Sequence, residues 1–246
     1  MQEKNKIIAS NIFFDNMSFL DAVEKIEELA ASPHFSYVVT PNIDHIARLC
    51  DPSTEKSLHD IYRRAALSLC DSRILQKLLR VKGKNVEEVI TGSGLTKYLF
   101  DKVLTGSDKA LVVGVEDVFI DRLRSLYPAL NIHHINPSMG FINKKQEVDD
   151  LLERIKRIDA NYLFLSVGSP RQEVLAGKIS TCDSIGGVGL CVGASVLFMV
   201  GAEKRAPRFL QKLHLEWAYR ILQNPQRLAV RYFKNFLSLP AIIKSL

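Results

Sequence analysis

Short apolar runs alternate with longer amphipathic stretches along most of this chain. Strand-like runs occupy residues 35–40, 65–70, 110–115, 131–135, 162–167 and 186–192, after an extended piece or hairpin at 7–14. Helices are expected from the capping-box pattern of Ser18 and Asp21, toward Cys50, over 116–126 and over 144–158. Apolar strands separated by helices are typical of a parallel sheet covered on both faces. The pattern predicts an α/β fold, with a Rossmann-like, mainly parallel sheet.

Small or polar residues follow four of the apolar runs. Ligands of such sheets bind beyond the carboxyl ends of the strands, so these four loops are the candidate site. They are Thr40-Pro41-Asn42, Asp71-Ser72, the loop from Gly168 to Gln172, and Gly193-Ala194-Ser195.

Each of these loops has a structural and a chemical interpretation. Asp71 fits the N-cap of the next helix, and it also fits a general base for a hydroxyl nucleophile. Thr40 and Asn42 fit either helix capping or binding of sugar hydroxyls. Gly168 and Ser169 precede Pro170 at a helix start, with Gln172 in the first turn. That arrangement suits a nucleotide phosphate or an ordinary capped helix. The residues alone leave these alternatives open.

Basic charge is concentrated at the end of the chain. Of the 246 residues, the last 46 hold nine Lys/Arg and two acids, a net charge of +7, while the first 200 sum to −1. We therefore expect a core over residues 1–200 and a basic amphipathic helical appendage over 201–246. Such a segment suits an anionic membrane surface, although two core-packed helices with a solvated basic edge would fit too. No motif that reads nucleic acid is visible.

Several other classes of protein are not supported by the sequence. No apolar secretory segment follows Met1, and the four cysteines form no CxxC pair, so we expect reduced thiols in a cytoplasmic protein. The chain contains no HExxH, GxSxG, P-loop or loop-borne DxD motif. We expect neither a metal nor a cofactor.

Three segments resemble the WecG/TagA/CpsF glycosyltransferases, glycosyltransferase family 26. They read VVTPNIDHIARL from Val38, SVGSPRQE from Ser166, and VGASVLFMVGAEKRAPRFLQKLHLEWAYRILQNPQRLAVRYF from Val192. The resemblance implies an inverting, metal-independent bacterial enzyme on a Rossmann-like fold. Its partners would be a UDP-sugar donor and a polyprenyl-diphosphate-linked acceptor, at the cytoplasmic face of the membrane, in surface polysaccharide synthesis. Whether the chain forms a homo-oligomer stays open.

The resemblance also assigns roles to residues. Asp71 matches the proposed catalytic base, Thr40 and Asn42 the active-site TPN motif, and Gln172 the glutamine of GSPxQE. The appendage arginines thought to reach the diphosphate correspond to Arg220, Arg227 and Arg231. With these facing inward, we expect the membrane contact to fall to Phe233, Lys234, Phe236, Leu237 and Lys244.

The chain departs from the family pattern around Asp71. The usual PDG is replaced by Cys70-Asp71-Ser72, residues 73–83 are atypical, and a family arginine and aspartate appear as Val89 and Gly94. These changes leave open a non-catalytic membrane-docking or assembly protein that keeps the fold. A separate alternative is a soluble nucleotide-binding enzyme unrelated to membranes.

Overall fold

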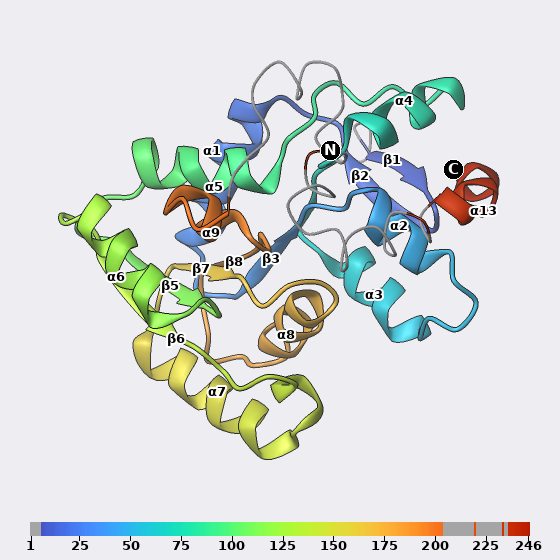
Figure 1. Ribbon diagram of the computed structural model, residues 1–246. Helices are drawn as coiled ribbons and strands as arrows, with labels where there is room; N and C mark the ends of the chain where they lie inside the picture. The colour runs from blue at the N-terminus through green and yellow to red at the C-terminus, as the bar shows by residue number, and fades with distance from the viewer. Residues whose placement is uncertain (1–5, 204–218, 220–232, 234–235) are drawn as a thin grey trace.

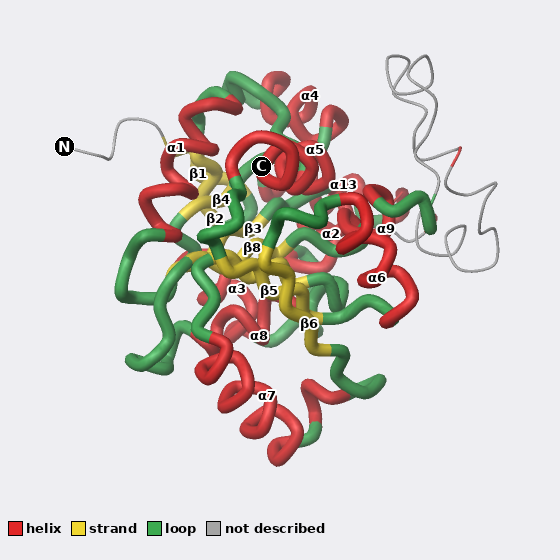
Figure 2. Tube along the Cα trace, turned by 90° about the vertical axis from the view of Figure 1, so that its left-hand side faces the viewer, coloured by secondary structure: helices red, strands yellow, loops and turns green. Residues whose placement is uncertain are grey.

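The computed structural model describes residues 6–203, 219, 233 and 236–246 of the chain. Its centre is a six-stranded sheet in which every neighbouring pair is parallel. The strands run through the middle of the molecule in Figure 2. In sheet order they are β4 (Leu67–Ser68), β3 (Ser36–Val39), β8 (Val188–Cys191), β7 (Tyr162–Leu165), β5 (Lys109–Val113) and β6 (Asn131–Ile135).

Successive strand residues enter two separate cores, one on each face of the sheet. In β7, Leu163 and Leu165 belong to one buried cluster, whereas Tyr162 and Phe164 belong to the other. The same alternation divides the residues of β5. Because side chains of a strand point alternately to the two faces, a strand covered on both sides must be apolar throughout. This confirms the predicted α/β fold and its parallel sheet.

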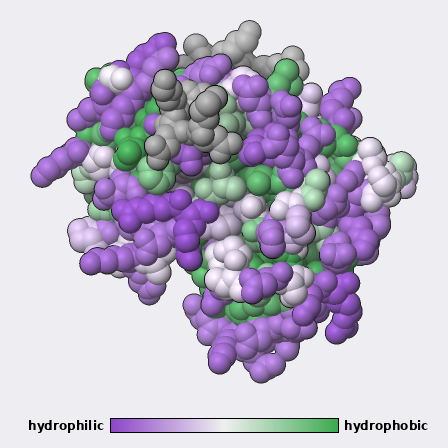
Figure 3. Space-filling model, turned by 180° about the vertical axis from the view of Figure 1, so that it is seen from behind, coloured by the Kyte–Doolittle hydropathy of each residue, from purple (hydrophilic) through white to green (hydrophobic). Residues whose placement is uncertain are grey.

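Helices form a layer on each face (Figure 1). Those whose apolar residues join the core of Leu163 and Leu165 are α2 (Ile43–Leu49), α3 (Lys56–Arg64), α4 (Arg73–Val81), α7 (Lys145–Ile158) and α8 (Arg171–Ile179). The core of Tyr162 and Phe164 is covered by α1 (Phe19–Ala30), α5 (Gly92–Tyr98), the π-helix η1 (Leu99–Val103), α6 (Asp117–Leu126) and α9 (Ser195–Met199). A short 3-10 turn, η2 (Phe141–Asn143), precedes α7, whose outer surface is hydrophilic in Figure 3.

The capping box predicted at Ser18 is present: Ser18 accepts from the amide of Asp21, and the Asp21 carboxylate accepts from the amide of Ser18. The strand at 131–135 has its predicted bounds, whereas the run at 65–70 yields only the two paired residues of the edge strand β4. The periodicity did not predict α3 or α5. The first is short and mostly polar, and the second begins with the glycines of Gly92-Ser-Gly94.

The two ends of the chain meet on the body. Strands β1 (Lys6–Ala9) and β2 (Ile12–Asp15) form an antiparallel hairpin, and Ser10 and Asn11 both have positive φ at its turn. The Ser10 amide donates to the Ser245 carbonyl at 2.8 Å. Ser245 ends α13 (Leu239–Ser245), which buries Ile242 completely in the core that contains β1, β2 and α2. The last helix of the segment predicted as an appendage is therefore packed against the body.

Within the described residues, no helix combines the length and the apolar character needed to span a bilayer.

The packing of α13 predicts a sharp difference between two adjacent isoleucines. Ile242→Ala should lower the free energy of unfolding by about 2–5 kcal/mol, because it leaves a cavity in the core. Ile243→Ala, the matched control, should cost less than about 1 kcal/mol, because Ile243 is 41% exposed. Urea unfolding followed by circular dichroism measures both. Equal costs would contradict the described position of the helix.

Candidate functional site

The four loops singled out by the sequence come together at the carboxyl edge of the sheet. The Asp71 amide donates to the Pro41 carbonyl at 3.0 Å. Thr40, which is 5% exposed, donates its hydroxyl to the Cys191 carbonyl at 3.1 Å. The Gly193 amide donates to the Gln172 side chain at 2.9 Å. These three bonds connect the ends of β3, β4, β7 and β8 into one layer of loops.

Asp71 does not cap the helix that follows it. The N-cap of α4 is Ser72, whose hydroxyl accepts from the Leu75 amide at 3.1 Å. The half-buried Asp71 carboxylate instead accepts from the Gly92 amide at 3.1 Å through Oδ2. The capping interpretation of Asp71 is therefore wrong, and the carboxylate is held across the layer of loops by a residue 21 positions away.

Gly92 is the site residue that the sequence did not reveal. A Cβ atom on Gly92 would lie 3.1 Å from Thr40 Oγ1 and 3.6 Å from both Asp71 Oδ2 and Ser195 Oγ. The backbone of α5 can approach these three polar atoms closely because no side chain intervenes. The available signal was Thr91, a capping residue directly before Gly92: its hydroxyl accepts from the Gly94 amide and starts α5.

Asn42 caps α2, as one of its two interpretations predicted. Its side-chain oxygen accepts from the amides of Asp44 at 3.0 Å and His45 at 3.4 Å. The amide nitrogen of Asn42 is not used by the cap and is chemically a donor. Thr40 does not cap α2. Its hydroxyl donates to the Cys191 carbonyl, and its oxygen is the atom nearest to a Cβ placed on Gly92.

The loop before α8 leaves the start of that helix without a side-chain cap. Gly168 has φ +78°, and Pro170 occupies the N-cap without a side-chain bond to the helix. Ser169 accepts from the Arg48 guanidinium at 2.7 Å, and Arg48 also pairs with Asp44 at 3.3 Å. The Arg48 guanidinium therefore lies beside Ser169, two residues before the first residue of α8.

Gln172 joins two parts of the site from a buried position. It is 2% exposed, and its oxygen accepts from Gly193 while its nitrogen donates to Glu173 at 2.9 Å. The two bonds fix the orientation of the side-chain amide. Glu173 is completely buried, and its Oε2 atom has no hydrogen-bond partner among the described residues. Burial, followed by the charge of Glu173, raises the pKa of Tyr62 well above its usual value.

Burial also raises the pKa of the Cys70 thiol, next to Asp71, to about 12. Cys70 is therefore a neutral thiol at physiological pH and offers no thiolate nucleophile to the site. All four cysteines are free. In the described part of the chain, no group of three or more His, Cys, Asp or Glu residues is arranged to hold a metal ion.

The predicted tail residues are only partly described. Phe233, Phe236 and Leu237 are 62%, 67% and 62% exposed, and Lys244 is exposed on α13. The remaining predicted positions, with much of the predicted helical appendage, lie outside the described residues: Arg220, Arg227, Arg231 and Lys234.

A parallel sheet with a carboxylate, hydroxyl groups and a helix start at its carboxyl edge is typical of α/β enzymes that bind nucleotides. The model of the glycosyl transferase WecG/TagA/CpsF family matches residues 7–246. The chain belongs to this family.

The chain is similar to several curated proteins, each named N-acetylglucosaminyldiphosphoundecaprenol N-acetyl-beta-D-mannosaminyltransferase. The proteins from Staphylococcus aureus strains MW2 and NCTC 8325 are each 25% identical over 230 residues, which is 91% of this chain and 87% of theirs. The protein from Bacillus spizizenii strain W23 is 29% identical over 165 residues, 65% of this chain and 60% of its own.

The bonds of Gln172 predict that this residue supports the site structurally. Gln172→Ala should lower the free energy of unfolding by about 2–4 kcal/mol, because the Glu173 carboxylate loses the bond from Gln172 and the Gly193 amide its acceptor. Arg171→Ala, on the preceding residue, should cost less than about 1 kcal/mol. Thermal unfolding of the two variants measures the difference. A neutral Gln172→Ala would show that these bonds do not hold the loops together.

Proposed function

We propose that this protein transfers a sugar from a UDP-sugar to a polyprenyl-diphosphate-linked saccharide, with inversion at the anomeric carbon and without a metal. The name of these relatives specifies an N-acetyl-β-D-mannosaminyl group and an N-acetylglucosaminyl-diphospho-undecaprenol acceptor. We propose the same classes of sugar and acceptor for this chain. The observation that carries the proposal is the Asp71 carboxylate, fixed by Gly92 where the loops meet.

Asp71 acts in this proposal as the general base. Its carboxylate takes the proton of the acceptor hydroxyl while the hydroxyl oxygen forms a bond to the anomeric carbon. The bond from that carbon to the UDP oxygen breaks on the opposite face, and UDP leaves with the electron pair. Because Oδ2 is bound to Gly92, the orientation of the carboxylate is set before the acceptor arrives.

The surrounding residues bind the donor in this proposal. The amide nitrogen of Asn42 and the hydroxyl of Thr40 face sugar or ribose hydroxyls. Gly168 and Ser169 receive a phosphate at the start of α8, where the helix dipole favours negative charge. Gln172 supports the donor site in this proposal, because its bonds to Glu173 and Gly193 hold the loops after β7 and β8 together.

The arginines of the tail complete the site. Without a metal, a departing diphosphate needs cations from the protein, and guanidinium groups bind phosphate oxygens in pairs. We assign this role to Arg220, Arg227 and Arg231. The same segment docks the enzyme peripherally on the inner face of the membrane, where Phe233, Phe236, Leu237, Lys234 and Lys244 contact lipid.

Asp71→Asn tests the base. Asparagine can still accept from Gly92 but cannot take a proton, so kcat should fall about 100- to 10,000-fold with little change in melting temperature. The assay is UDP release from a panel of UDP-sugars in the presence of a short GlcNAc-diphosphate-lipid. Asp150→Asn, on the exposed surface of α7, is the control with the same chemical change.

Full activity of Asp71→Asn would rule out Asp71 as the base. Wild-type protein that binds vesicles but turns over no sugar nucleotide would favour a non-catalytic docking protein.

The tail arginines are tested by substitution rather than truncation, because removing residues after Ala202 also removes the buried Ile242. Changing Arg220, Arg227 and Arg231 together to Gln should reduce kcat/KM about 100- to 1,000-fold through lost phosphate contacts. The control changes Arg205, Arg208 and Lys212 to Gln, which removes the same charge from the same segment. Equal losses in the two variants would indicate a general charge effect and would contradict the assigned role.

A further inference from the structure

The outward face of α4 consists of basic and apolar side chains only. The helix buries Leu75 and Leu79 completely against the body. The opposite side of the helix carries Arg73, Ile74, Lys77, Arg80 and Val81, all of which are exposed. At 3.6 residues per turn these five positions form one continuous surface.

The charge of this segment is one-sided. Residues 73–84 contain five Lys/Arg and no acid, although the first 200 residues as a whole sum to −1. No described side chain forms a salt bridge with Lys77, Arg80 or Lys82. The surface of α7 is different, because its sequence KQEVDDLLERIKRI contains as many acids as bases. The field of α4 is therefore not cancelled locally, and it favours an anionic partner.

Two apolar side chains lie within this basic surface. Val81 is 84% exposed at the end of the helix and Ile74 is 38% exposed near its start. A nucleic acid would bind the cations but would gain nothing from burying Ile74 and Val81. An anionic bilayer satisfies both, since it offers charged headgroups and an apolar phase a few ångströms deeper.

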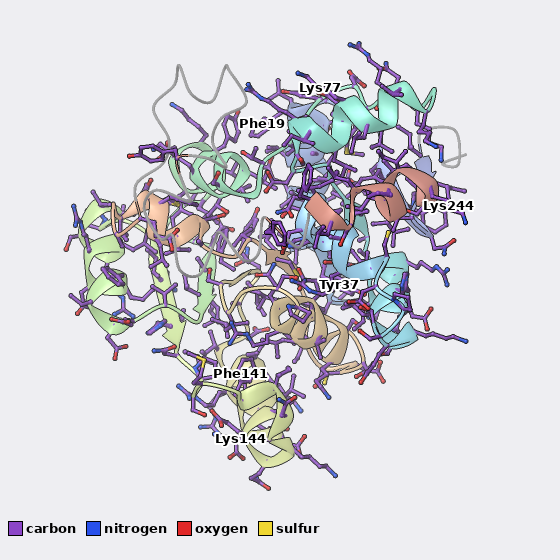
Figure 4. The ribbon with its side chains drawn as sticks, turned by 45° about the vertical axis from the view of Figure 1, so that its right-hand side comes forward. Phe19, Tyr37, Lys77, Phe141, Lys144 and Lys244 are labelled. Carbon is purple, nitrogen blue, oxygen red and sulfur yellow. The ribbon has the colours of Figure 1, made fainter. Side chains whose placement is uncertain are left out.

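The segment that follows α4 contacts both ends of the described chain. Lys84, just beyond α4, donates to the Ile8 carbonyl at 2.7 Å and bonds the carbonyl of Leu246. Ile8 is 60% exposed on the hairpin, and Lys244 is exposed on α13. In Figure 4, Lys77 on α4 and Lys244 on α13 both lie at the periphery of the molecule.

We propose that the outward face of α4 is a second membrane-docking surface, built into the body of the protein and directed at anionic lipid headgroups. The proposal rests on the peripheral membrane location proposed above and adds a contact that does not involve the tail. It also explains how the site is oriented. Because α4 begins two residues after Asp71 and is about 14 Å long, a helix held at the headgroups keeps the carboxylate near the end of a lipid-linked acceptor.

The test compares two variants that lose the same charge. One changes Lys77, Arg80 and Lys82 to Gln, and the other changes the exposed α7 residues Lys145, Lys156 and Arg157 to Gln. Partition of the full-length protein is measured by co-sedimentation with vesicles of phosphatidylglycerol and phosphatidylethanolamine, and with pure phosphatidylcholine. The α4 variant should bind the anionic vesicles about 100-fold more weakly than wild type, whereas the α7 variant should bind like wild type. Val81→Trp should strengthen binding.

Sugar transfer to a short, soluble GlcNAc-diphosphate acceptor is measured in parallel and should be unchanged in both variants. Equal vesicle binding by wild type and the α4 variant would overturn the α4 surface and leave the transferase proposal standing. Wild-type protein that transfers sugar but binds no vesicle would overturn the α4 surface and the membrane location together, and leave the chemistry. Binding of single-stranded RNA is measured on the same variants. An α4 variant that loses RNA binding but keeps vesicle binding would show that α4 serves a nucleic acid, and would also overturn the proposal.

Discussion

Parallel pairing is the constraint on which the rest of this structure depends. Parallel strands must be joined by crossovers, so every strand ends at the same edge, and helices cover both faces. The side chains of β7 divide between two cores for this reason. The loops at the carboxyl edge are then brought within hydrogen-bonding distance of one another, and Asp71, Thr40 and Gln172 are tied by backbone amides and carbonyls from other loops.

The sequence predicted what depends on near neighbours along the chain. Continuous apolar runs located the strands and helical spacing located most helices, and the Ser18 capping box closes within three residues. It failed where a distant contact decides between two local options. Asp71 and Ser72 are both good caps, and which one caps α4 depends on Gly92, 21 residues away, which binds the Asp71 carboxylate. The buried pair of Gln172 and Glu173 follows the same rule, because its partner Gly193 comes from another strand end.

The basic face of α4 and the arginines of the tail have different roles in the proposed enzyme. A cation on a packed helix such as α4 keeps a fixed position relative to the sheet, because Leu75 and Leu79 anchor the helix in the core. Contacts through α4 would set the angle of the body on a surface, whereas the arginines assigned to the diphosphate act on the substrate itself. In the proposed enzyme, the orientation of the body and the binding of the substrate could therefore be altered separately.

The contact between Ser10 and Ser245 has a consequence for the order of folding. The two residues are 235 positions apart, and they meet at the hairpin turn and the final helix. During synthesis the hairpin leaves the ribosome well before its partner helix α13 is made. The contact between Ser10 and Ser245 therefore closes only after the basic residues between 204 and 234 have been translated. Docking of α13 against the hairpin therefore joins residues on both sides of the basic segment in one core.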